Sequence, residues 1–101
     1  MILRRRRYRE VVDRQLELFA SEDADVLIGV DDALERYNAA DADDAEELYG
    51  DYQLAIEAAT DRLGELRDTY ARTLEDPDEY VREFNAAVVK RWRALTLTIE
   101  D

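Results

Sequence analysis

Five arginines lie within the opening stretch MILRRRRYR, and their side chains are well suited to binding a charged partner. They are Arg4, Arg5, Arg6, Arg7 and Arg9. A guanidinium group binds phosphate and carboxylate oxygens through paired N–H donors. The run therefore has two interpretations: a basic arm that contacts nucleic acid or anionic lipid, or a segment that neutralises acidic residues of its own fold. The formal net charge of the whole chain is −12, so it supplies many carboxylates for the second interpretation.

Three aromatic residues near the other end of the chain form a second candidate group: Tyr80, Phe84 and Trp92. Trp92 stands in the basic segment 90–93, an arrangement suited to stacking on a nucleic-acid base. The alternative is that Trp92 docks a terminal helix on the rest of the protein, as large aromatic side chains commonly do. We take these three aromatic residues, together with the five arginines, as the candidate interaction surface.

The residue types that the chain lacks exclude most catalytic chemistry. It contains no histidine and no cysteine, so an imidazole base and a zinc site built from these ligands are both impossible. Ser21 is the only serine, and no histidine is present to activate it. The acidic run 41–47 does not fit a calcium loop, because Ala45 and Glu46 stand where an oxygen ligand and a glycine are needed. We predict no catalytic residue, no metal site and no cofactor, and expect the protein not to be an enzyme.

The composition indicates a single all-α domain that spans residues 1–101. Charged residues make up 40% of the chain, well above the usual ~25%, and hydrophobic residues make up 47%. Such a chain needs many solvated faces for each buried face, as narrow helical bundles do. One proline and three glycines supply too few turns for a β-sandwich or barrel.

Helical spacing of apolar residues predicts the elements. The first segment, 4–38, is either one long helix with a kink or two helices broken near Ser21, and the kept phase of its apolar residues favours one nearly continuous rod. The second, 41–74, carries an unbroken heptad stripe typical of a coiled coil. The third begins at Pro77 and runs to about Leu95, and residues 94–101 form an extended or frayed tail.

Two rods of similar length joined by a short turn predict an antiparallel hairpin, with the third helix packed on it. A turn centred near Ala40 places the arginine run beside the end of the second rod. The segment there, 75–79, reads EDPDE. We therefore predict that Arg4 to Arg7 pair with these acids, at ~0–1 kcal/mol for each exposed pair.

The third helix is too short to cover both long stripes, so apolar surface should remain exposed. Exposed apolar surface of this kind usually marks a partner site. We expect a non-catalytic helical interaction or adaptor module that self-associates, with a dimer favoured, or that binds another helical protein. The alternative is a small nucleic-acid-associated regulator that uses the arginine cluster. No segment approaches the ~18 apolar residues of a membrane span, and we expect a cytoplasmic protein.

Overall fold

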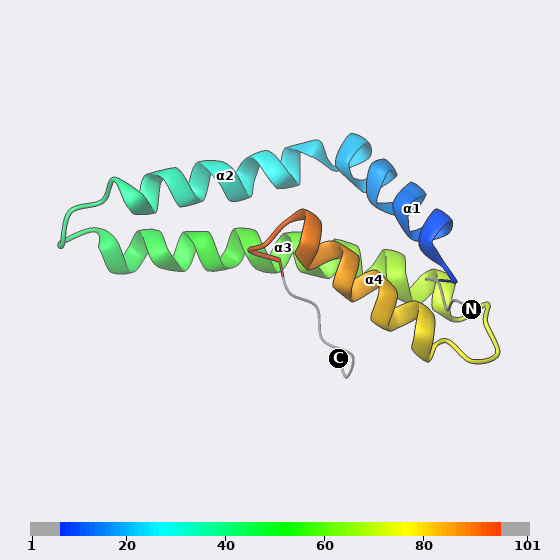
Figure 1. The fold of residues 1–101 in the computed structure, drawn as a ribbon. Coiled ribbons are helices and arrows are strands. Elements are labelled where there is room, and N and C mark those ends of the chain that lie inside the picture. The colour runs from blue at the N-terminus through cyan, green and yellow to red at the C-terminus, as the bar shows by residue number, and fades with distance from the viewer. Residues whose placement is uncertain (1–6, 96–101) are drawn as a thin grey trace.

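The computed structural model describes residues 7–95, which form four α-helices and no strand. They are α1 (Arg9–Glu22), α2 (Ala24–Asn38), α3 (Ala45–Ala71) and α4 (Asp78–Arg91). The molecule is elongated, with extents of 55 × 27 × 26 Å (Figure 1). The predicted all-α class is confirmed, as is a small helical bundle. The predicted tail falls largely outside the described residues.

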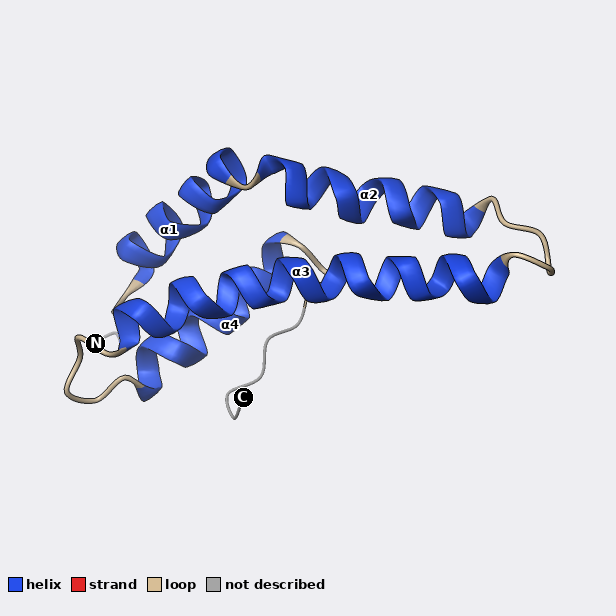
Figure 2. Ribbon diagram, turned by 180° about the vertical axis from the view of Figure 1, so that it is seen from behind, coloured by secondary structure: helices blue, strands red, loops and turns tan. Residues whose placement is uncertain are grey.

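The first rod is two helices, and the break lies at Asp23 rather than at Ser21. Asp23 has φ −112° and ψ 33°, and its N–H still donates to the Phe19 carbonyl at 2.8 Å. Ser21 lies inside α1 and does not cap a helix. The break turns α1 away from the axis of α2 (Figure 2). The SED stretch at 21–23 has no apolar side chain to hold it against α3, so the helix can bend there.

Helices α2 and α3 form the predicted antiparallel hairpin. The rings of Tyr37 and Tyr49 lie 5.3 Å apart, so these two residues are close together, as predicted. The register nevertheless differs along the whole hairpin. A turn centred at Ala40 places Asp43 level with Tyr37 and Glu57 level with Asp23, whereas Tyr37 contacts Tyr49 and Asp23 pairs with Arg62, five or six residues further along α3. Helix α3 begins at Ala45, later than predicted, because residues 42–44 form a turn in which Asp44 N–H donates to the Asp41 carboxylate at 3.2 Å.

Helix α4 runs back along the second half of α3 and also packs against α1 (Figures 1 and 2). Pro77 is its N-cap residue, and Asp78 N–H donates to Asp76 Oδ1 at 3.4 Å. The helix ends at Arg91, earlier than the predicted Leu95, because Trp92 is extended (φ −133°, ψ 93°). A turn from Trp92 brings Leu95 back into the core, so the residue is buried without being helical.

The buried core lies where α1, α3 and α4 meet. Its residues are Val12, Leu16, Phe19, Val30, Ala59, Leu63, Tyr80, Phe84, Val88 and Leu95. Of these, Val30 alone comes from α2. The part of the hairpin beyond α4 is therefore a two-helix arm with a thin interior. We use "arm" below for residues 24–61.

Candidate interaction surface

Two residues of the predicted surface lie in the core instead. Tyr80 and Phe84 are both 0% exposed, so the prediction that they contribute to a surface is wrong. Both project from α4 toward α1 and α3, where the Tyr80 ring lies 4.8 Å from that of Tyr70. The Tyr80 hydroxyl donates to Gln15 Oε1 at 2.8 Å. Burial raises the pKa of Tyr80 to about 12, although the Gln15 hydrogen bond acts in the opposite direction.

Trp92 docks the end of α4 on α1. Its ring meets the Phe19 ring edge-to-face at 5.5 Å, and the Arg91 guanidinium lies 5.0 Å from the centre of the indole. Arg91 also pairs with Glu17 of α1 at 3.5 Å. These contacts match the docking interpretation of Trp92, because the ring is half-buried against its own fold.

The described arginines of the N-terminal cluster contact acids of their own chain. Arg7 Nη1 lies 3.6 Å from Glu79 Oε1, which is one of the predicted pairings. Arg9 lies 3.9 Å from Asp13, one helical turn away. Arg4, Arg5 and Arg6 lie outside the described residues. Within residues 7–95, neither Glu75 nor Asp76 forms an ion pair.

Sequence reasoning missed the residue that holds the start of α1. The two carboxylate oxygens of Glu83 accept the backbone N–H groups of Arg7 and Tyr8, each at 3.0 Å. Tyr8 is the N-cap residue of α1 and Arg7 precedes it, so neither N–H group has a partner within the helix, and Glu83 of α4 supplies one to both. This contact joins α4 to the start of α1 and fixes the backbone of Arg7 at this end of the molecule.

A buried arginine was also missed. Arg67 is 3% exposed, its Nε donates to Asp68 Oδ1 at 2.8 Å, and its Nη1 donates to Asn85 Oδ1 at 3.0 Å. The available signal is its spacing, because Arg67 follows the buried Leu63 by four residues on α3 and so shares its face. A charged residue is normally expected on the surface, but α4 covers Arg67.

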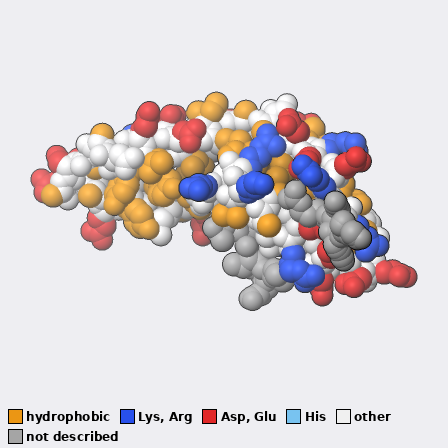
Figure 3. Space-filling model, in the orientation of Figure 1, with side chains coloured by type: hydrophobic (Ala, Val, Ile, Leu, Met, Phe, Trp, Pro, Cys, Tyr) orange, Lys and Arg blue, Asp and Glu red, His pale blue; other side chains and the backbone are white. Residues whose placement is uncertain are grey.

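Beyond the end of α4, hydrophobic side chains of the arm remain uncovered. A shallow groove of about 580 Å³ is lined by four hydrophobic residues of α3, which we call the arm patch: Tyr49, Tyr52, Leu54 and Ile56. Ala94 also lines this groove. Leu54 is 64% exposed and Tyr49 44%. Figure 3 shows hydrophobic side chains gathered on this part of the molecule, with Lys and Arg side chains at their border.

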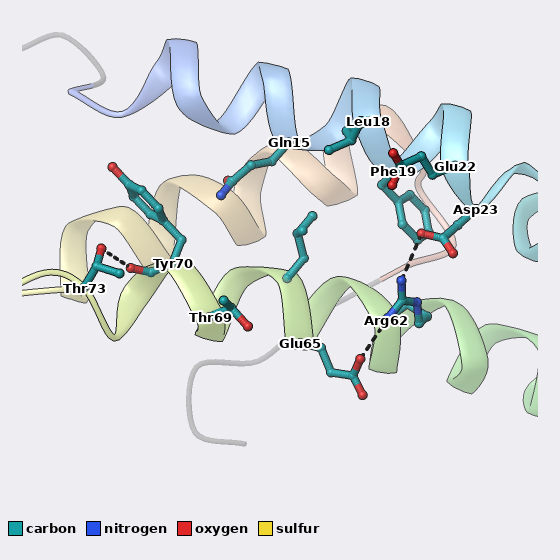
Figure 4. A pocket seen from close by; sticks show the side chains of 11 residues that line it. Gln15, Leu18, Phe19, Glu22, Asp23, Arg62, Glu65, Thr69, Tyr70 and Thr73 are labelled. Atoms are coloured by element: carbon teal, nitrogen blue, oxygen red, sulfur yellow. Dashed lines mark hydrogen bonds and ion pairs between the residues drawn. The ribbon is translucent and has the colours of Figure 1, made fainter.

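A second groove, of about 440 Å³, separates α1 from α3 because the break at Asp23 tilts α1 (Figure 4). Phe19, Leu66 and Tyr70 are among its apolar lining residues. At one end Arg62 bridges Asp23 at 3.4 Å and Glu65 at 3.0 Å. The hydrogen bond with Asp23 raises the pKa of Arg62 above its usual value. Among its charged lining residues, Asp23, Arg62 and Glu65 pair with one another, whereas Glu22 forms no ion pair among residues 7–95.

Charge is distributed very unevenly along the molecule. The arm contains twelve Asp and Glu residues and one basic residue, Arg36, so its formal charge is −11 of the total −12. The remaining residues therefore sum to −1. At the border of the arm patch, the end of α4 carries the exposed basic residues Lys90, Arg91 and Arg93. The patch thus lies between an acidic tip and a basic corner.

Other classes of site find no support in the described part of the chain. No cluster of three metal-ligating side chains occurs among those residues. None of the helices formed by residues 7–95 combines the length and the apolar character needed to cross a bilayer. No protein-family model matches the sequence, and neither a curated protein nor a solved structure matches it. Functional inference therefore rests on the geometry and charge of this chain alone.

Proposed function

We propose that the protein is a non-catalytic helical protein–protein interaction module that self-associates through the arm patch. The observation that carries this proposal is the mismatch in helix length. Helix α4 has 14 residues and α3 has 27, so α4 covers the second half of α3 and leaves Tyr49 and Leu54 of the arm patch exposed. Leu54, at 64% exposure, is the most exposed large hydrophobic side chain of the described residues.

The thin interior of the arm supports the same proposal. The buried residues of α2 are Val30 and Ala33, two small side chains, while Ile28 and Leu34 of the same helix are exposed. Two helices cannot bury a full apolar face by themselves, and most helical stability in proteins comes from packing of such faces. A partner that covers the arm patch would add the missing third side of this bundle.

The test is the molecular mass in solution, measured by light scattering over a wide range of protein concentration. Leu54→Glu should weaken self-association by at least about 30-fold, because each copy loses roughly 1–2 kcal/mol of apolar burial. Two matched controls carry the same change elsewhere. Ile28→Glu lies on the arm but outside the patch, and Leu18→Glu lies in the α1–α3 groove. Both controls should leave the association within about threefold of the parent.

A mass that stays monomeric at every concentration contradicts self-association. Loss of association in Leu18→Glu, with Leu54→Glu unaffected, moves the interface to the α1–α3 groove. The nucleic-acid alternative is tested by titrating mixed-sequence DNA at several salt concentrations, because phosphate contacts give a steep fall of affinity with salt. The contacts of Arg7 with Glu79, and of Trp92 with Phe19, favour the interaction module over that alternative.

A further inference from the structure

We infer that two copies of the chain pack antiparallel about a two-fold axis at the arm patch, so that the acidic tip of each copy lies on the basic corner of the other. The acidic tip consists of the exposed residues Asp41, Asp43, Asp44, Glu46 and Glu47. The basic corner consists of Lys90, Arg91 and Arg93 at the end of α4. This inference rests on the proposed self-association and adds its geometry and its electrostatics.

The spacing of these groups along α3 fits the two-fold arrangement. At ~1.5 Å per residue, Glu46 and Glu47 lie roughly 11 Å from Leu54 toward the turn. The lining of the groove continues to Thr60, roughly 9 Å beyond Leu54 along α3, and also includes Ala94. Arg93 of the basic corner directly precedes Ala94 in the chain. Because α4 packs on the second half of α3, its basic end lies on the opposite side of the patch from the acidic tip.

A two-fold axis through the patch exchanges these two sides. Every contact of an isologous interface occurs twice, so each acidic tip meets a basic corner and each corner meets a tip. Parallel packing would instead place two arms of charge −11 tip against tip. Like charges brought together at an interface disfavour that arrangement, whereas complementary charges fix the register of the antiparallel one.

Lys90 and Arg93 are the members of the corner best placed for a partner. Arg91 already pairs with Glu17 and stacks on Trp92. Within residues 7–95, neither Lys90 nor Arg93 forms an ion pair. At the tip, Asp41 accepts the N–H of Asp44 and so shapes the turn, whereas Glu46 and Glu47 sit in the first turn of α3. The test therefore changes Lys90 and Arg93 on one side and Glu46 and Glu47 on the other.

Charge exchange separates specific pairing from general repulsion. Lys90→Glu with Arg93→Glu, the corner variant, changes the net charge from −12 to −16, and Glu46→Lys with Glu47→Lys, the tip variant, changes it to −8. General repulsion between acidic molecules predicts that the corner variant associates more weakly and the tip variant more strongly. The antiparallel dimer predicts that both variants associate at least about tenfold more weakly than the parent, because each places like charges together where residues 46 and 47 of one copy meet residues 90 and 93 of the other.

Complementation completes the experiment, with dissociation constants measured by sedimentation at low and high salt. A chain that carries all four changes should dimerise within about threefold of the parent, because residues 46 and 47 again meet residues 90 and 93 of opposite charge. An equimolar mixture of the tip and corner variants should form heterodimers in preference to either homodimer. Asp31→Lys with Glu35→Lys also gives −8 at exposed arm positions away from the tip, and it should not weaken association.

Circular dichroism of each variant checks that the helices are retained. Stronger association of the tip variant, or failure of the four-change chain to recover, overturns the antiparallel arrangement while leaving self-association intact. A parent chain that remains monomeric at all concentrations and salt levels overturns the proposed function itself. The two failures therefore give different results.

Discussion

Replacing Glu83 by alanine should destabilise the protein more than removing an exposed ion pair such as that of Arg7 with Glu79. The Glu83 carboxylate accepts two backbone N–H groups, from Arg7 and Tyr8, at 3.0 Å each. Hydrogen bonds to charged groups contribute about 1.5–3 kcal/mol when shielded from water. One of these two is exposed and the other half-buried, so we expect a total loss of about 1–3 kcal/mol for Glu83→Ala.

Arg7→Gln supplies the comparison. It removes the 3.6 Å contact with Glu79, in which the Arg7 side chain is 68% exposed. A pair of this kind contributes about 0–0.5 kcal/mol and is screened by salt. The backbone N–H of Arg7 remains in this variant, so the hydrogen bond to Glu83 survives. Arg7→Gln should therefore cost much less than Glu83→Ala, and its cost should vanish at high salt.

Urea and thermal unfolding followed by circular dichroism measure both effects. For a chain of this size, ~1 kcal/mol corresponds to a shift in Tm of about 4–8 °C. Glu75→Gln is the control for Glu83→Ala, because it also removes one negative charge but at a position without an ion pair among residues 7–95. Equal losses for Arg7→Gln and Glu83→Ala would refute the reasoning, because side-chain charge rather than the backbone cap would then hold the start of α1.

Three further predictions concern the body of the protein and can be checked by the same unfolding measurements. Leu63 is 0% exposed, so Leu63→Ala should lower the free energy of unfolding by ~2–5 kcal/mol. Glu57 is exposed, so Glu57→Ala should change it by no more than ~0.5 kcal/mol. Equal effects would show that the core does not lie on this face of α3. Because burial raises the pKa of Tyr80 from 10.0 to about 12, the unfolded chain loses this proton first, and stability should fall by about 2–3 kcal/mol between pH 10 and 12. Tyr80→Phe should abolish that part of the fall, and a parallel fall in both proteins would contradict the assignment. A Cβ at Gly64 meets no atom within 4 Å, so Gly64→Ala should stabilise α3 by about 0.5–1 kcal/mol, and a loss of stability would reveal a close contact at that position.

The helices and the hairpin were predictable because they depend on local periodicity. The heptad stripe of 45–73 indicated one long helix, and α3 occupies 27 residues of it, with Ala59 and Leu63 buried. The nearness of Tyr37 and Tyr49 was predicted from the turn, although the register along α3 is shifted by five or six residues. These features need no knowledge of distant partners, since side chains three or four residues apart share a helix face whatever lies opposite.

The contacts that join distant segments were harder to predict. The break at Asp23 depends on whether α1 continues along α3 or turns toward α4. The helical spacing of the apolar residues in 4–38 is the same in both cases, so the sequence pattern does not distinguish them. Glu83 and Arg67 look like solvent-exposed charges in sequence, yet one caps α1 and the other lies beneath α4. For the same reason Tyr80 and Phe84 were assigned to a surface, because an aromatic stripe does not reveal which side of it another helix covers.

The described arginines of the N-terminal cluster and the excess acidic charge lie at opposite ends of the fold. The described arginines Arg7 and Arg9 lie near the N-terminal end of the fold, whereas the α2–α3 turn lies at the far end (Figure 1). Nearly all of the excess negative charge, −11 of −12, resides in the arm that ends at this turn. Arg7 therefore neutralises Glu79 beside it and leaves the charge of the arm unbalanced within one copy. In the proposed antiparallel dimer, Lys90 and Arg93 at the border of the arm patch offset part of the partner's acidic charge, and the same packing covers Leu54.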